Sequence, residues 1–181
     1  MRYSIVLSIF LCLLLGCCSE QPNERILFDF ETDRELDRFH WKCHTLLALS
    51  DDHVTHGRKS LKLELFPSEY PGLAPMIKDT NWSKHETLRF DVYNPQSSVL
   101  PLTVRIDDRD ESADFNERSN KTFSIKPGAN TVSIPLKSLV TSGGGRPLNL
   151  KSIRRLVVFM GQPKETTVLY FDYFRLGKVM P

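Results

Sequence analysis

Three aspartates, Asp107, Asp108 and Asp110, lie close together in the sequence and could take part in acid–base chemistry. Glycoside hydrolysis needs a pair of carboxyl groups, one on each side of the bond that breaks. The sequence contains neither the Gly-x-Ser-x-Gly motif of a serine nucleophile nor the His-Glu-x-x-His motif of a zinc hydrolase. Because one small domain offers few walls for a deep cleft, we expect a protein that is not an enzyme. A small polysaccharide lyase or glycosidase is the alternative that these carboxylates keep open.

Asp172 is another informative carboxylate, because it interrupts the apolar run 168–174. Burial of an unpaired charge is costly, so this aspartate needs a partner unless its side chain is exposed. A salt bridge to Arg175, Lys59 or Lys62 would supply one. The five histidines are scattered through the first half of the chain, and no Cys-x-x-Cys motif is present. The sequence therefore predicts no zinc site.

The elements that would position these side chains are short strands, in which apolar and polar residues alternate. One such strand places Arg105 and Asp107 together on the face opposite Leu102, Val104 and Ile106. The predicted strands are 25–31, 45–50, 60–66, 88–93, 102–107, 123–125, 131–135, 155–159 and 168–174. Polar loops are expected at 108–120 and 140–146, and one helical turn at 148–153. Strands at this spacing fit two packed antiparallel sheets, an all-β sandwich.

The first residues indicate where the protein is located. Arg2 precedes an apolar run that is too short to remain as a membrane-spanning helix, and Leu-Leu-Gly-Cys17 follows. This arrangement resembles the lipobox of bacterial lipoproteins, in which the cysteine is acylated after cleavage. We therefore expect a signal peptide at 1–16, a lipidated Cys17 with a polar tether over 17–24, and a domain at 25–181. An ordinary secretory signal is the alternative. Lipid anchoring predicts the cell envelope and, in a Gram-negative bacterium, the outer membrane, because aspartate does not follow Cys17.

The charge and the cysteines of the mature chain indicate which partners it can have. After removal of Arg2 with the signal peptide, the mature chain has 23 basic and 22 acidic residues, and no basic stripe is visible in its sequence. Nucleic acid is therefore not an expected partner. Cys18 and Cys43 could pair in an oxidising compartment. Alternatively, Cys43 is a buried thiol and Cys18 is free or acylated.

Several short motifs occur in an order that resembles the galactose-binding-domain-like jelly roll of many carbohydrate-binding modules. The resemblance extends from Ile26 to Gly177. The motifs are Phe28-Asp-Phe-Glu31, His56-Gly-Arg-Lys-Ser-Leu61, Asp79-Thr-Asn-Trp-Ser83, Leu88-Arg-Phe-Asp-Val-Tyr-Asn94, Pro127-Gly128, Asn130-Thr-Val-Ser-Ile-Pro-Leu136 and Leu169-Tyr-Phe-Asp-Tyr-Phe-Arg-Leu176. It implies a two-sheet antiparallel jelly roll, although this architecture also serves protein docking and structural roles.

The resemblance implies a structural calcium ion where the first and last strands meet. Calcium prefers carboxylate and carbonyl oxygens. Glu31 and Asp172 match the family positions, and Asp29 is a further candidate ligand.

The resemblance also implies a sugar site of aromatic and planar polar side chains. Trp41, in an expected early loop, and Tyr70 would stack against the sugar, while Arg105 and Asp107 would bind its hydroxyls. Asp108 and Arg118 would support them. Trp82 is expected to pack in the core.

Taken together, these features predict a lipid-anchored, non-catalytic module that binds a glycan or polysaccharide in the bacterial envelope. A structural or protein-docking lipoprotein with the same fold, facing another envelope protein, is the alternative.

Overall fold

The computed structural model of this chain describes residues 24–110 and 114–178, with the backbone alone at 40–42. The predicted signal peptide, Cys17 and Cys18 lie outside the described residues, so the lipid anchor and the disulfide stay predictions. Cys43 is half-buried and has no disulfide partner within the described part of the chain.

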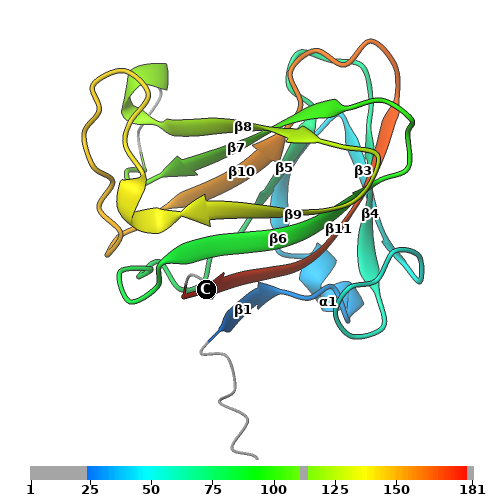
Figure 1. Ribbon diagram of the computed structural model, residues 1–181, viewed down its shortest axis with the longest axis horizontal. Coiled ribbons are helices and arrows are strands. Elements are labelled where there is room, and N and C mark those ends of the chain that lie inside the picture. The colour runs from blue at the N-terminus through cyan, green and yellow to red at the C-terminus, as the bar shows by residue number, and fades with distance from the viewer. Residues whose placement is uncertain (1–23, 111–113, 179–181) are drawn as a thin grey trace, which may run out of the picture.

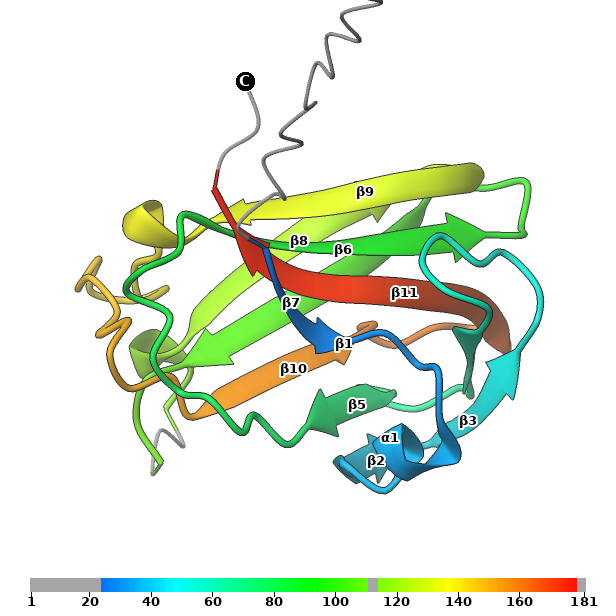
Figure 2. The same ribbon diagram turned by 90° about the horizontal axis from the view of Figure 1, so that it is seen from below.

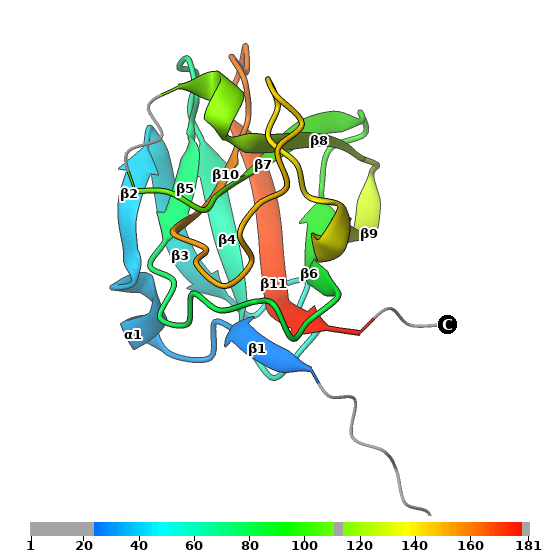
Figure 3. The same ribbon diagram turned by 90° about the vertical axis from the view of Figure 1, so that its left-hand side faces the viewer.

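The described chain forms two antiparallel sheets that pack face to face (Figures 1 and 2). Sheet 1 has the order β3-β4-β11-β6-β9, and β1 pairs with β11 beyond the end of β4. Sheet 2 has the order β2-β5-β10-β7-β8. Figure 3 shows β1 beside the end of β11 at one end of the sandwich. This is the β-sandwich of jelly-roll type that the sequence predicts.

The strands are β1 (Arg25–Phe28), β2 (Phe39–Cys43), β3 (Thr45–Ser50), β4 (Ser60–Leu65), β5 (Gly72–Pro75), β6 (Thr87–Asn94), β7 (Leu100–Asp107), β8 (Ser119–Ile125), β9 (Gly128–Pro135), β10 (Arg155–Phe159) and β11 (Thr167–Gly177). A four-residue helix, α1 (Asp33–Leu36), and the 3-10 turns Phe115–Glu117 and Leu136–Ser138 complete the described elements.

The core lies between the sheets and is filled by the apolar residues of the alternating pattern. Leu102, Val104 and Ile106 of β7 are buried there, as their spacing predicts. One end of the core is a cluster of stacked and edge-to-face phenylalanine rings: Phe28, Phe30, Phe39, Phe90, Phe171 and Phe174. Such pairs add about 1 kcal/mol each beyond the burial of their area.

Two strands of sheet 2 are missing from the sequence prediction. The segment that contains His40 and Trp41 is strand β2 and not a loop, and β5 is a four-residue strand that begins at Gly72 and ends at Pro75. Glycine and proline are disfavoured inside strands, and β2 shows no clean alternation, so local pattern gives no strand signal. Pairing with neighbouring strands forms both of them, because β5 pairs with β10 and β2 pairs with β5.

Two further local expectations have different outcomes. Residues 148–153 form a turn and no helix, so that prediction is wrong. Trp82 is fully buried and its indole N–H donates to the carbonyl of Asp79 at 3.0 Å, so its predicted role in packing is confirmed. No helix in the described residues is long and apolar enough to cross a bilayer.

Candidate functional site

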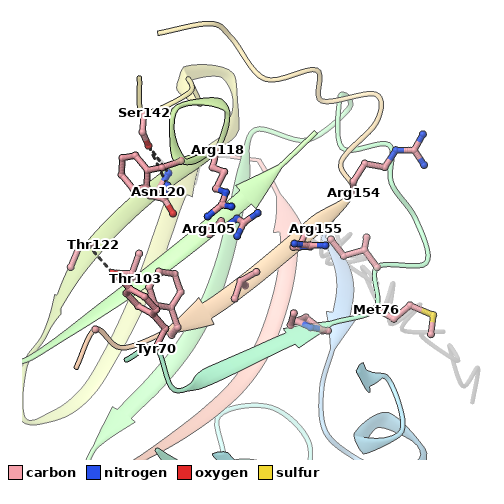
Figure 4. A pocket seen from close by; sticks show the side chains of 17 residues that line it. Tyr70, Met76, Thr103, Arg105, Arg118, Asn120, Thr122, Ser142, Arg154 and Arg155 are labelled. Atoms are coloured by element: carbon pink, nitrogen blue, oxygen red, sulfur yellow. Dashed lines mark hydrogen bonds between the residues drawn. The ribbon is translucent and has the colours of Figure 1, made fainter. Parts of the chain in front are cut away.

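A groove of about 1040 Å³ lies on the outer face of sheet 2 (Figure 4). Its lining comes from strands β5, β7, β8 and β10 and from the loops that flank them. The lining residues are Tyr70, Ala74, Pro75, Met76, Ile77, Thr103, Arg105, Phe115, Arg118, Asn120, Thr122, Ser142, Arg154, Arg155, Val157, Phe159 and Gly161.

The register of the strands decides which side chains form the floor of the groove. Arg105 of β7 lies opposite Asn120 of β8 and Val157 of β10. Two residues earlier in β7, Thr103 lies opposite Phe159. Since side chains alternate between the faces of a strand, these residues all project away from the core. The floor is therefore a regular array of alternate residues from three paired strands.

Aromatic side chains lie along the groove. Tyr70 is 49% exposed and meets Phe159 edge to face, with ring centroids 5.8 Å apart. Close approach of β5 to β10 depends on Gly72, because a Cβ there would lie 2.3 Å from the carbonyl oxygen of Val158. Phe115, in the loop before β8, is 60% exposed. Exposed rings of this kind offer flat apolar faces to a ligand.

The polar lining is dominated by arginines. Arg105 is held by Asp107, with its Nε 2.9 Å from a carboxylate oxygen, and Asp107 is only 1% exposed. Burial and the neighbouring positive charges of Arg105 and Arg155 lower the pKa of Arg118 from its usual value. The guanidinium groups of these three residues are therefore close enough to act on one another electrostatically.

The hydrogen bonds of Asp108 give it a structural role. It is buried, accepts two hydrogen bonds from Arg146 at 2.7 and 3.0 Å, and accepts a third from the backbone N–H of Asn149. The bonds from Arg146 are the main reason that the pKa of Asp108 lies below its usual value. This carboxylate ties the loop before β10 to the end of β7.

The predicted sugar ligands are only partly brought together. Tyr70, Arg105 and Arg118 line the same groove. Asp107 lies behind Arg105, and Asp108 is turned toward Arg146, so neither carboxylate lines it. The sixth, the indole of Trp41, lies outside the described residues, although its backbone belongs to β2 of the same sheet.

Sequence reasoning missed the contribution of β10 to this site. Arg155, Val157 and Phe159 face the groove as alternate residues, and Arg154 lines it from the same segment. The sequence of β10 indicates a strand, but the apolar Val157 and Phe159 give no sign that their face of the strand is open to solvent. An aromatic and an arginine two or four residues apart on a strand could have drawn attention to it.

The carboxylates of two predicted calcium ligands, Asp172 and Glu31, accept hydrogen bonds from the chain itself. Asp172 is 1% exposed and accepts hydrogen bonds from the backbone N–H groups of Thr55, His56 and Tyr173. Burial raises the pKa of Asp172 from its usual value, against the opposing effect of these bonds. No predicted salt bridge from Arg175, Lys59 or Lys62 reaches this carboxylate among the described ion pairs.

Glu31 accepts the N–H groups of Arg58 and Lys59 at 2.8 and 2.9 Å, and these bonds lower its pKa. Asp29 lies near Glu35 instead, whose carboxylate accepts its backbone N–H. In the described part of the chain, no three His, Cys, Asp or Glu side chains come close enough to hold a metal ion. N–H donors therefore already engage both Asp172 and Glu31. The calcium hypothesis stays a prediction.

No protein-family model matches the chain, and no curated protein is significantly similar to it. Solved structures are similar in fold. A family 11 carbohydrate-binding module from Clostridium thermocellum, in complex with a β-1,3-1,4-mixed-linked tetrasaccharide, superposes with a TM-score of 0.66 at 16% identity over 87% of this chain and 96% of that one. A family 30 carbohydrate-binding module gives a TM-score of 0.57 at 13% identity over 87% and 91%.

An exo-β-agarase gives a TM-score of 0.70 at 18% identity over 86% of this chain, which spans only 26% of that enzyme. At these identities the likeness establishes the fold. The chain has the jelly-roll fold of carbohydrate-binding modules, as its motif order predicts.

Proposed function

We propose that this protein is a non-catalytic glycan-binding module, held in a bacterial envelope by a lipid on Cys17. The groove on sheet 2 is the observation that carries the proposal. It combines exposed aromatic rings, Tyr70 and Phe115, with the planar donors of the arginines on its floor.

Glycan recognition needs both kinds of side chain. The C–H face of a sugar ring stacks on an aromatic ring, and planar polar groups bind its oxygens in pairs. Tyr70 supplies the first contact and Arg105 the second, across a floor that β7 and β10 keep in register. A groove open along the sheet, rather than a closed cavity, suits a polymer chain. The oligosaccharide complex of the family 11 module supports this class of ligand.

The proposed anchor would keep the module close to the membrane. Glu24, the first described residue, is largely buried, forms an ion pair with Arg89, and accepts a hydrogen bond from the Tyr173 hydroxyl at 2.9 Å. This leaves residues 18–23 between the proposed lipid and the sandwich, a reach of roughly 20 Å when fully extended.

Protein docking is the second candidate. Met76 is 43% exposed and lies in the same groove as the exposed rings of Tyr70 and Phe115. Exposed apolar side chains that gather in one place also mark protein interfaces. A partner in the envelope would then cover the groove in place of a glycan.

A glycan-array screen of the full chain in mild detergent tests the proposal, with Tyr70→Ala and Tyr70→Phe as paired variants. We expect hits for the wild type and for Tyr70→Phe, which keeps the ring. Tyr70→Ala should lose up to about tenfold in affinity without unfolding, because stacking on one aromatic ring is worth about 0.5–1.5 kcal/mol and about 1.4 kcal/mol is a tenfold change. A folded wild type that binds no glycan would favour docking.

A further inference from the structure

The charge of the groove differs from that of the chain as a whole. The sequence contains 24 basic and 22 acidic residues, so its net charge is small. Among the described residues that line the groove, four are arginines, and none is an aspartate, glutamate or lysine. Folding therefore concentrates positive charge on one face of the molecule. The composition alone does not reveal this concentration.

Three of the four arginines lie together in the groove. Figure 4 shows Arg105, Arg118 and Arg155 near one another, with Arg154 further along the groove and Tyr70 at its other end. Their mutual repulsion contributes to the lowered pKa of Arg118. An arrangement of like charges is unfavourable in the free protein, and an anion bound among them would relieve it.

Acidic side chains lie beside two of these arginines. Asp107 is buried behind Arg105, and Asp110 lies 3.7 Å from Arg154 at an exposed position. Arg155 is exposed and forms no ion pair with any residue in 24–110 or 114–178. At least this guanidinium is open to a ligand.

The same lining holds no carboxylate, and its acceptors are hydroxyl and amide oxygens. Arginine side chains only donate, whereas a neutral sugar hydroxyl needs an acceptor as well as a donor. The hydroxyl groups of Thr103 and Thr122 bond to each other at 2.9 Å, and Ser142 accepts from Asn120. A lining rich in donors fits ligand groups that only accept.

We propose that the groove binds glycans that carry carboxylate or sulfate groups. This inference rests on the proposed function and names the class of glycan. Guanidinium groups bind both anions through two parallel hydrogen bonds, which are stronger than bonds between neutral groups. Tyr70 would stack against a sugar ring while Arg155, with Arg105 and Arg118, binds the charged substituent.

Matched polysaccharide pairs test the inference with the full chain in mild detergent. One pair is polygalacturonate and its fully methyl-esterified form, and the other is a sulfated galactan and agarose. We expect the charged member of at least one pair to bind about tenfold tighter or more at low salt. The advantage should shrink at about 0.5 M sodium chloride, because salt screens exposed charges. The two pairs distinguish carboxylate from sulfate recognition.

Variants of one groove arginine provide the second readout. Arg155→Gln should weaken binding of the charged glycan about tenfold and that of its neutral counterpart much less. Arg155→Lys should retain part of the preference, because it keeps the charge but loses the paired donors. Arg34→Gln, at an exposed position in α1, is the matched control and should change nothing.

The outcomes separate the two proposals. Equal or tighter binding of the neutral polysaccharides would overturn the anionic class and leave the glycan-binding function in place. An Arg155→Gln effect equal on both members of a pair would also overturn it. If no polysaccharide binds to the folded protein, both proposals fail.

Discussion

At the scale of single residues, the same side-chain type has different roles in different surroundings. Asp107 and Asp108 are adjacent in the sequence, yet one holds Arg105 at the groove and the other ties down Arg146. Neither is placed to contact a ligand directly. Arg105 owes its position to Asp107, since a guanidinium bound by a buried carboxylate has few alternative conformations.

Asp108 should make the protein sensitive to acid. Its pKa in the folded state lies below the ordinary value of an aspartate, chiefly because of the hydrogen bonds from Arg146. The unfolded chain therefore takes up this proton at a higher pH than the folded chain does. The stabilisation is complete above the unfolded pKa and is lost as the pH falls through the folded pKa. Between pH 5 and pH 3, the melting temperature of Asp108→Asn should fall less than that of the wild type.

Asp110→Asn is the control for this measurement, because Asp110 is largely exposed. It should show the pH dependence of the wild type. Asp108→Asn should also cost about 2 kcal/mol at neutral pH, since the charge is lost and one of the two oxygens that accept from Arg146 and the Asn149 N–H becomes an NH₂ donor. Parallel pH curves for Asp108→Asn and the wild type would contradict the assignment.

At the scale of elements, close contacts between strands shape the groove. Gly72 allows β5 to lie against β10, and this brings Tyr70 to Phe159. We expect Gly72→Ala to lower the free energy of unfolding by about 2 kcal/mol, because the added methyl group overpacks the Val158 carbonyl. Glycan affinity should fall as well. Gly161→Ala is the matched control, because a Cβ there meets no atom within 4 Å; equal melting temperatures for the two variants would refute this explanation.

Two carboxylates from other elements hold the loop that joins β3 to β4. Asp172 of β11 accepts the N–H groups of Thr55 and His56, and Glu31 accepts those of Arg58 and Lys59. Asp172→Ala would leave buried donors without a partner, at a cost of about 3 kcal/mol. The melting temperature should fall by several degrees. Asp33→Ala, an exposed change in α1, should have little effect.

The same variants test calcium. If the ion binds at Asp172 and Glu31, calcium should raise the melting temperature of the wild type and of Asp33→Ala, but not of Asp172→Ala. A wild-type melting temperature that is equal in calcium and in chelator would rule out the predicted site. The N–H donors would then be sufficient partners for both carboxylates.

At the scale of the whole molecule, the proposed lipid anchor and the proposed glycan site would together make the protein a receptor for glycans at a membrane surface. Cys17→Ser should abolish lipidation and release the protein from the membrane fraction, with glycan affinity unchanged. Mass spectrometry of the mature N-terminus would measure the acyl chains. A Cys17→Ser protein that stays in the membrane fraction would contradict the lipid anchor.

Sequence alone determined the elements with clean alternation. The core positions of β7 and the bounds of β10 and β3 follow from local pattern, because each strand has one face in the core and one outside. Trp82 was also predictable, and so was the jelly roll, from the order of its motifs.

Tertiary structure decided the rest. Strands β2 and β5 exist because paired neighbours supply their hydrogen bonds, and no local signal encodes that. The groove joins Tyr70, Arg105, Arg118 and Arg155 from segments up to 85 residues apart, so only the pairing of β5, β7, β8 and β10 brings them together. The sequence determined which residues face outward, and the tertiary structure decided which outward residues share one site, because that depends on pairing between distant strands.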